Sequence, residues 1–331
     1  MVHHVWNKLL ETWHKFIFFA KFFICTYLCF SSFFTFAQSE TKTGAFYVNW
    51  GKVSETNLKQ QTQKLNVFFP CWLTVNEGGN GIVTKTNAKT LSIVRNATLE
   101  IVPVLVKGKI TKDELITKLK DESNSQKLID EIVNYVVSNQ FAGLNLDFEY
   151  FSSHHQPVLL NFCKSLRSQL NQNGKKLYTD IYPQDKNYLI SEYVKVSDFV
   201  VLMCYDQYNA RTQAGAVGGI DWIANICNEN KSFASKIWIG FPTYGYEWSD
   251  KCRPITYPQL LQRSNQVFVK DDVTKNIKAN YEYNGKNCIT YFAGYELAKE
   301  TLEMAEKMNF AGVCFWRMGC EDPKIWDFFV K

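Results

Sequence analysis

Short runs of β-branched and aromatic residues alternate with stretches of helical periodicity along most of this 331-residue chain. Such alternation is typical of parallel strands wrapped by helices, because each parallel connection needs a crossover segment. The predicted strands are residues 44–50, 65–73, 100–106, 143–149, 176–183, 198–206, 236–246 and 311–319. Eight such units predict an α/β fold, the (β/α)8 TIM barrel, whose usual size is about 250 residues with room for insertions.

The longest gap between predicted strands separates the seventh from the eighth and covers about residues 249–290. This gap contains short β-like pieces of its own, so we expect a small insertion on the rim of the barrel. A doubly wound open sheet is the alternative fold, but no glycine-rich phosphate loop follows the first strand, where such folds usually place one. No repeat or linker divides residues 38–331, so we expect one barrel domain there.

The amino-terminal segment, residues 1–37, is predicted to be a signal peptide. Residues 16–36 are almost wholly apolar apart from Lys21, and Thr35-Phe36-Ala37 places small residues where a signal peptidase cleaves. We expect cleavage after Ala37 and export, which would make the protein secreted or resident in the periplasm or cell envelope. An uncleaved anchor that associates with the membrane is the alternative, because residues 16–37 with a snorkelling lysine can span a bilayer.

Charge and cysteine content exclude other classes of protein. The formal charge of +5 includes a net +2 from residues 1–37, and no run of Lys and Arg interleaves with aromatic residues, so we expect no nucleic-acid partner. The eight cysteines after residue 37 form no C-x-x-C pair and have no metal-ligand spacing with histidine, so a zinc site is not expected. Cys252 and Cys288 could form a disulfide, which a domain of this size does not need.

The fourth predicted strand, within FAGLNLDFEY at residues 141–150, alternates apolar residues with Asn145, Asp147 and Glu149. In a barrel, alternate side chains point inward, so these polar residues climb the interior toward the carboxyl-terminal mouth, where barrel active sites lie. Neighbouring carboxylates in a desolvated site cannot both ionise cheaply, so one should hold a proton near neutral pH. Glu149 is therefore predicted to be a general acid, with Asp147 sharing its proton. A water-exposed strand is the alternative, but parallel strands are normally covered on both faces.

This strand resembles the signature of family 18 glycoside hydrolases, the chitinase-like barrels, which is written D-G-x-D-x-D-x-E with the glutamate as acid. Similar matches to other strands of the family are FYVNW at 46–50, MCYD at 203–206, GFPTYG at 240–245 and VCFWRMG at 313–319. The matches fall in the family's order and span about residues 44–329. The closest resemblance is to a bacterial branch of spore peptidoglycan hydrolases and barrel modules fused to polysaccharide deacetylases or glycosyltransferases.

Two positions depart from the signature. Ala142 stands where the first aspartate is expected. By strand alternation it should point away from the ladder of Asn145, Asp147 and Glu149, so we expect the missing aspartate to affect the structural support of the site more than its chemistry. Asn145 replaces the middle aspartate, as that bacterial branch often does, and keeps hydrogen-bonding capacity toward Asp147. It also removes a negative charge, so the pKa values of the acid pair should rise less than beside a third carboxylate.

The resemblance implies a substrate-assisted retaining mechanism, in which the sugar's own 2-acetamido carbonyl attacks the anomeric carbon. Glu149 would protonate the leaving oxygen, and Asp147 would orient the acetamido group. The implied substrate-binding residues are Asn145, Tyr205, Asp206, Tyr244, Trp316, Trp50 and Met203. The implied substrate is a polysaccharide with β-linked N-acetylglucosamine, such as peptidoglycan, a chitin-like chain or an exopolysaccharide, and we expect a monomer without metal or cofactor.

A carbohydrate-binding barrel of the same family with weak or no turnover is the alternative function, which Ala142 and Asn145 keep open. The joint retention of Glu149, Asp147, Tyr205 and Asp206 favours the enzyme. His154 and His155 follow the acidic strand and invite a metal or base role, but the other three histidines stand at positions 3, 4 and 14. Adjacent residues rarely face one ligand together, so we interpret this pair as loop residues.

Overall fold

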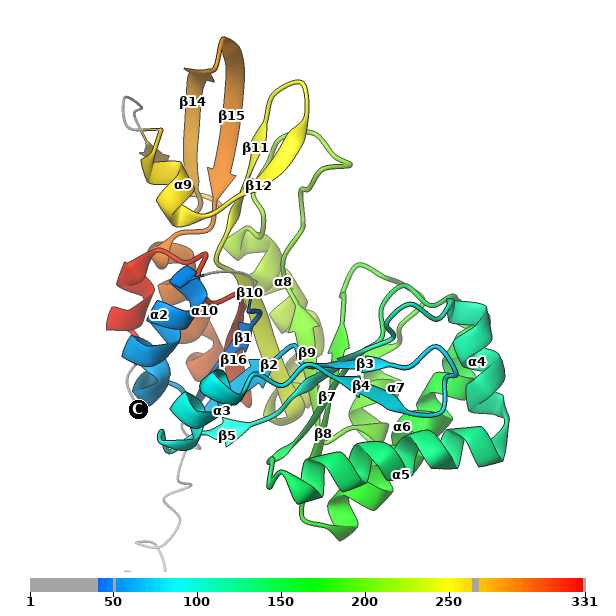
Figure 1. The fold of residues 1–331 in the computed structure, drawn as a ribbon. Helices are drawn as coiled ribbons and strands as arrows, with labels where there is room; N and C mark the ends of the chain where they lie inside the picture. Colours follow the sequence, from blue (N-terminus) through cyan, green and yellow to red (C-terminus); the bar gives the residue numbers. More distant parts are fainter. Residues whose placement is uncertain (1–40, 50–51, 264–267, 330–331) are drawn as a thin grey trace, which may run out of the picture. The chain divides into compact units, whose positions relative to one another are not determined.

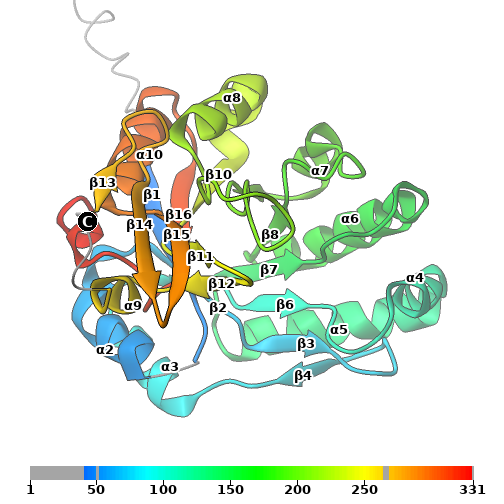
Figure 2. The same cartoon turned by 90° about the horizontal axis from the view of Figure 1, so that it is seen from above.

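The computed structural model describes residues 41–49, 52–263 and 268–329. The predicted signal peptide and Trp50 lie outside these residues. Within them, an eleven-stranded sheet curls into a barrel, in which the first strand, β1, pairs in parallel with β2 and with the last strand, β16 (Figures 1 and 2). The predicted (β/α)8 barrel is confirmed.

The barrel strands correspond one to one with the predicted strands, except that the third is split in two. They are β1 (Lys42–Tyr47), β2 (Val67–Pro70), β5 (Glu100–Ile101), β6 (Val104–Val106), β7 (Gly143–Asp147), β8 (Lys176–Ile181), β9 (Phe199–Met203), β10 (Ile237–Pro242) and β16 (Gly312–Trp316). The short strands β3 (Leu73–Val75) and β4 (Ile82–Thr84) extend the sheet beside β6.

Helices surround the barrel (Figure 2). They are α2 (Lys52–Gln61), α3 (Ala88–Arg95), α4 (Lys112–Lys120), α5 (Glu122–Ser138), α6 (Gln156–Gln172), α7 (Ile190–Val196), α8 (Ile220–Asn230) and α10 (Tyr295–Lys307). Side chains capping the first turn explain several of their starts: Thr111 and Glu114 form a capping box on α4, and Asp121 accepts from Asn124 N–H on α5.

Pro103 explains the split third strand, because proline has no backbone N–H to donate to a neighbouring strand. The first part, β5, pairs with β2, and the second part, β6, pairs with β7. The Pro103 carbonyl still accepts a 2.9 Å hydrogen bond from Asn145 N–H. The two short pieces together close the barrel where one long strand was predicted.

Aromatic side chains fill the lower part of the barrel interior. The ring centroids of Phe69, Tyr178 and Trp238 lie 5.5–6.0 Å apart with edge-to-face geometry. Glycine at position 312 makes room for them, since a Cβ there would lie 2.6 Å from the Trp238 ring. Because this aromatic packing fills the interior, a ligand pocket can form only above it, at the carboxyl ends of the strands.

The segment between β10 and α10 forms a second, antiparallel sheet, which stands beyond the carboxyl end of β10 in Figure 1. Its elements are β11 (Gly245–Trp248), β12 (Cys252–Ile255), α9 (Tyr257–Leu261), β13 (Val269–Lys270), β14 (Ile277–Tyr283) and β15 (Lys286–Phe292). The fully buried Glu247 holds this sheet together by accepting from Arg253 at 2.7 Å, from Arg263 at 2.9 Å and from Tyr281 at 2.5 Å.

The eight cysteines after residue 37 are all free thiols, so Cys252 and Cys288 do not form the disulfide that the sequence allowed. Several of them are buried in the barrel, as their apolar surroundings predicted. None of the helices within the described ranges is both long enough and apolar enough to cross a membrane.

Candidate functional site

A pocket of about 300 Å³ opens at the carboxyl ends of the barrel strands. Its lining combines carboxyl groups, phenols and large apolar side chains that lie on six barrel strands or on the loops that follow them. The lining residues are Phe46, Asp147, Glu149, Tyr150, Asp180, Tyr182, Met203, Tyr205, Asp206, Tyr244 and Trp316. This is the end of a barrel at which active sites lie.

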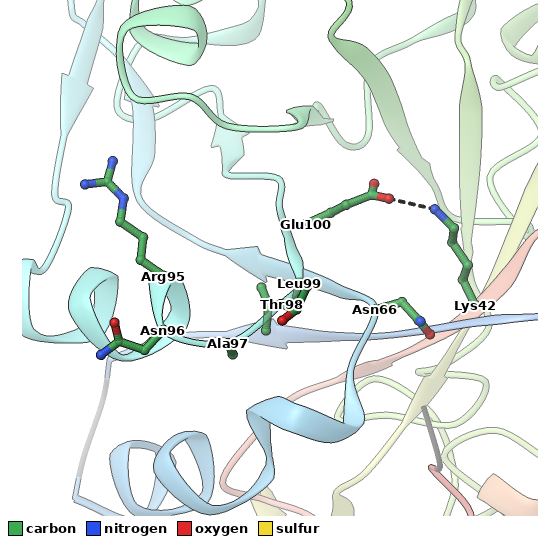
Figure 3. A pocket seen from close by; sticks show the side chains of 8 residues that line it. All are labelled: Lys42, Asn66, Arg95, Asn96, Ala97, Thr98, Leu99 and Glu100. Carbon is green, nitrogen blue, oxygen red and sulfur yellow. Dashed lines mark hydrogen bonds and ion pairs between the residues drawn. The ribbon is translucent and has the colours of Figure 1, made fainter.

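A larger cavity, of about 600 Å³, lies at the opposite end, where β1 and β5 begin (Figure 3). Its charged groups already have partners: Lys42 pairs with Glu100 at 2.7 Å, and Arg95 points away from that pair and donates to the Asn139 carbonyl at 3.0 Å. The pocket at the carboxyl ends, which gathers coupled acids, is therefore the candidate site.

Strand β7 places its polar residues as the predicted alternation requires. Asn145 is fully buried inside the barrel, and Asp147 and Glu149 line the pocket above it. Leu144 and Leu146 pack in the outer core among residues of the surrounding helices. The two carboxyl groups therefore stand at the mouth of the barrel.

The alternation does not extend to Ala142, because this residue precedes the first residue of β7. Its side chain packs against the inner cluster that contains Phe69 and Trp238. The expectation that Ala142 points away from the interior side of the strand is therefore wrong. It packs at the amino-terminal end of the barrel, seven residues before Glu149.

A third carboxyl group, Asp180 on β8, lies beside this pair, and the sequence analysis did not identify it. The signal was present, because Tyr178, Asp180 and Tyr182 share one face of the predicted strand 176–183. Burial raises the pKa of Asp180 well above its ordinary value; the nearby Asn145 amide offsets this in part, and the charge of Glu149 adds to it. Asn145 therefore reduces the negative charge of the ladder, while Asp180 restores a third acid from the next strand.

The carboxyl groups of Asp147 and Glu149 are hydrogen-bonded to each other, and both resist ionisation. Burial, the charges of Asp180 and Glu149, and a hydrogen bond to Glu149 raise the pKa of Asp147 well above its ordinary value. Burial also raises the pKa of Glu149, and hydrogen bonds with Asp147 and Tyr150 offset part of that rise. Both acids of the pair therefore retain protons up to pH values at which isolated carboxyls are ionised.

Asp206 follows β9 in a left-handed backbone conformation, with φ of 58°, that turns its side chain into the pocket. Its carboxylate accepts hydrogen bonds from the hydroxyls of Tyr244 and, at 3.0 Å, Tyr246. The following turn uses only its carbonyl, which accepts from Asn209 at 3.0 Å. The second sheet therefore supplies one of the partners of Asp206 through β11.

Tyr205 and Trp316 complete the wall of the pocket. Burial, followed by the charges of Asp180 and Asp147, raises the pKa of Tyr205 well above its ordinary value, so its phenol is a neutral hydrogen-bond donor. Trp316, at the end of β16, packs against Phe46 with ring centroids 5.6 Å apart. Met203 is buried in the same wall. The predicted contact residue Trp50 lies outside the described residues.

Four lining residues were absent from the sequence prediction. They are Phe46, Tyr150, Asp180 and Tyr182. Phe46 and Tyr150 lie within the quoted segments 46–50 and 141–150, and Asp180 and Tyr182 share one face of the predicted strand 176–183. Tyr182 also donates a 3.2 Å hydrogen bond to the Asp206 carbonyl, which links the loops after β8 and β9.

His154 and His155 lie outside this pocket, at the start of α6. The third member of their group is a carboxylate and not another histidine. Asp113 on α4 approaches His155 Nε2 at 3.1 Å. One donor atom from each of Asp113, His154 and His155 lies within 4.8 Å of the others. The pair is therefore part of a cluster, not two independent loop residues.

Carboxyl groups that retain protons, beside an aromatic side chain at the mouth of a (β/α)8 barrel, are typical of barrel enzymes that act on sugars. Comparison of the sequence with family models identifies the family: the chain belongs to the glycosyl hydrolases family 18, whose model matches residues 42–322. The family resemblance of the five strand segments is thus confirmed.

Curated relatives include two proteins of Bacillus subtilis (strain 168). The cortical fragment-lytic enzyme is 22% identical over 264 residues, 73% of this chain and 61% of the relative. The uncharacterized glycosylase YvbX is 22% identical over 227 residues, 63% of this chain and 66% of the relative. The chain therefore spans less than two thirds of the length of both relatives.

Solved structures show the same fold. The spore cortex-lytic enzyme SleL of Bacillus cereus superposes with a TM-score of 0.79 at 17% identity, covering 87% of this chain and 73% of that one. A chitinase from Chromobacterium violaceum ATCC 12472 also gives 0.79, at 16% identity, covering 87% and 97% of the two chains.

Proposed function

We propose that this protein is an exported glycoside hydrolase that cleaves polysaccharides containing β-linked N-acetylglucosamine, with Glu149 as the general acid. The observation that carries the proposal is the coupled pair at the pocket mouth, in which burial raises the pKa of both Glu149 and Asp147. A carboxyl that holds its proton toward neutral pH can donate it to a leaving oxygen. The family membership and the names of the relatives, a cortical fragment-lytic enzyme and a chitinase, support the substrate class.

In this mechanism Glu149 gives its proton to the glycosidic oxygen as the bond to the anomeric carbon breaks. The acetamido oxygen of the same sugar forms the new bond to that carbon, so the substrate supplies the nucleophile. Glu149, now a carboxylate, then removes a proton from the water that displaces the acetamido oxygen. Asp147 would orient the acetamido group and stabilise the charge that develops on it.

The other pocket acids are poorly placed to act as a protein nucleophile, which supports the substrate-assisted route. Asp180 is buried beneath the mouth, and burial favours its protonated form. The Asp206 carboxylate is held by the hydroxyls of Tyr244 and Tyr246. We assign Asp206 and Tyr205 to hydrogen bonds with the acetamido group, and Trp316 to stacking against the apolar face of the sugar.

We further propose that residues 1–37 direct export, with cleavage after Ala37. The apolar run of residues 16–36 and the small residues that precede the cleavage position support this assignment. Amino-terminal sequencing of the protein isolated from its native cells tests it, because a mature chain must begin at Gln38. A chain that begins at Met1 and fractionates with membranes would support the anchor instead.

Incubation of the purified protein with peptidoglycan, chitin oligomers and poly-N-acetylglucosamine tests the hydrolase proposal, with released reducing ends as the readout. We expect product from at least one glycan, and a loss of about 10³-fold in kcat for Glu149→Gln. Glu282→Gln, on an exposed position of β14, is the matched control and should keep full activity.

Binding measurements on the same glycans separate the hydrolase from a carbohydrate-binding barrel. Glu149→Gln keeps the shape of the pocket, so it should bind the substrate without cleaving it. If the parent protein binds a glycan as tightly as this variant and neither releases product, the hydrolase proposal fails and the binding barrel replaces it.

A further inference from the structure

We propose that Asp113, His154 and His155 form a binding site for a divalent transition-metal ion of the zinc class. Asp113 comes from the first turn of α4, and the two histidines come from the 3-10 helix Ser153–His155 that leads into α6. One ligand atom from each residue lies within 4.8 Å of the other two. Two imidazoles and one carboxylate are a donor set that transition-metal ions favour, with water completing the coordination.

Neighbouring polar groups already orient His155 toward Asp113. His155 Nε2 faces Asp113 Oδ1 at 3.1 Å, while His155 Nδ1 lies 3.1 Å from the Ser152 hydroxyl. The same hydroxyl lies 3.1 Å from Nδ1 and 3.4 Å from Nε2 of His154. A hydrogen bond at one ring nitrogen of His155 fixes the orientation of its ring and leaves the other nitrogen free to bind an ion beside Asp113. The two rings, although adjacent in sequence, lie with centroids 4.0 Å apart.

The burial of the three side chains allows the donors to close on an ion. Donor atoms around a tetrahedral zinc ion lie roughly 3.4 Å from one another, given bonds of about 2.0–2.1 Å. The His155 side chain is only 8% exposed and is fixed, whereas the Asp113 side chain is 88% exposed and His154 is also exposed. The exposed pair can therefore contract around an ion that the buried histidine positions.

A bound ion would link the loop that follows β7 to α4. Residues 150–155 connect Glu149 to α6, and a neighbouring contact already ties this loop to α4: Lys112 donates to the Tyr150 carbonyl at 2.7 Å. The ion would strengthen the existing contact of His155 with Asp113 and bring His154 into it. This inference concerns metal binding and loop order, and its test uses no glycan, so it stands or falls separately from the proposed hydrolase activity.

Zinc binding to the purified full chain tests the inference. His3, His4 and His14 also offer imidazoles, so the test uses a background in which these three are changed to glutamine. In this background we expect one equivalent of Zn²⁺ to bind, and an excess of about 100 Kd to raise the unfolding temperature by about 5 °C. Equal concentrations of Mg²⁺ or Ca²⁺ should give no shift, because these ions prefer sets of oxygen ligands.

Asp113→Asn and His154→Gln each remove one ligand, so each should weaken Zn²⁺ binding at least tenfold. Both side chains are exposed, so neither substitution should unfold the protein. Asp130→Asn, at an exposed position of α5, is the control and should bind as the background does. Backbone hydrogen exchange of residues 150–155 should slow on addition of Zn²⁺ in the background and not in His154→Gln. The absence of saturable binding, or equal affinity in both site variants and the background, would overturn the inference.

Discussion

The Asp180 carboxyl on β8 lies beside the Asp147 carboxyl on β7, and its charge is the largest contribution after burial to the raised pKa of Asp147. Strand register brings the two acids together, because Leu146 pairs with Thr179 one residue before each of them. Burial raises the pKa of Asp180 as well. The pocket therefore concentrates carboxyls that resist ionisation, at a cost to the stability of the fold near neutral pH.

The first prediction concerns that cost. An acid whose pKa is higher in the folded than in the unfolded state takes up protons on folding, so its contribution to stability falls as pH rises from its ordinary value toward the raised one. For Asp180 the ordinary value is 3.8. Asp180→Asn removes the ionisable group and should stabilise the protein at pH 8 by about 0.5–2 kcal/mol, with a smaller gain at pH 5.

Thermal unfolding at the two pH values measures this difference. Asp221→Asn, at an exposed position in the first turn of α8, is the matched control and should leave the pH dependence unchanged. A gain from Asp180→Asn that is the same at pH 5 and pH 8 would show that the carboxyl charge is not the source of the effect.

The second prediction tests the nucleophile. A glycan whose acetamido group at the cleaved position has been replaced by a free amine should lose cleavage by about 10³-fold or more in kcat/KM, because the attacking oxygen is absent. The loss should match that of Glu149→Gln to within an order of magnitude, since both changes disable the same step. Equal rates on the acetylated and deacetylated glycans would exclude the substrate-assisted route.

The third prediction concerns the second sheet's contribution to the pocket. Tyr246, on β11, donates a 3.0 Å hydrogen bond to Asp206 Oδ1, and a hydrogen bond to a charged group contributes about 1.5–3 kcal/mol. Tyr246→Phe should therefore lower kcat/KM about tenfold or more by releasing the Asp206 carboxylate. Steady-state kinetics check this, with Tyr283→Phe on β14 as the control, and an unchanged kcat/KM would remove Tyr246 from the site.

The fourth prediction concerns the stability of that sheet. Burial alone would raise the pKa of Glu247, but hydrogen bonds from Arg263, Tyr281 and Arg253 outweigh burial and hold the pKa below its ordinary value. Glu247→Gln leaves the largely buried Arg263 without its counter-charge, which should cost about 3–5 kcal/mol in the free energy of unfolding.

Denaturant unfolding and limited proteolysis near residues 245–292 measure this loss. A lowered pKa means that the Glu247 carboxylate stabilises the fold above its ordinary pKa of 4.5, and this stabilisation is lost as pH falls below that value. The deficit of Glu247→Gln relative to the parent should therefore shrink on acidification. Glu282→Gln should show no deficit at any pH, and a Glu247→Gln protein as stable as the parent would contradict the prediction.

Local patterns along the chain were sufficient to predict the barrel and the acid ladder. Strand alternation has a period of two residues, so the inward placement of Asn145 and Asp147 follows from the sequence of one strand alone. The same rule failed at Ala142, because alternation holds only inside a strand and β7 begins one residue later. The split of the third strand at Pro103 was also readable from the sequence, since proline lacks the backbone donor.

Contacts between distant segments were decided by the tertiary structure. Asp180 reaches Asp147 through the register of two neighbouring strands, and Tyr246 reaches Asp206 because the second sheet returns to the mouth of the barrel. Asp113 lies 41 residues before His154 and meets it only where α4 packs near the start of α6. Sequence periodicity reports which face a residue occupies, whereas the partner on that face depends on strand register and helix packing, which act across the whole chain.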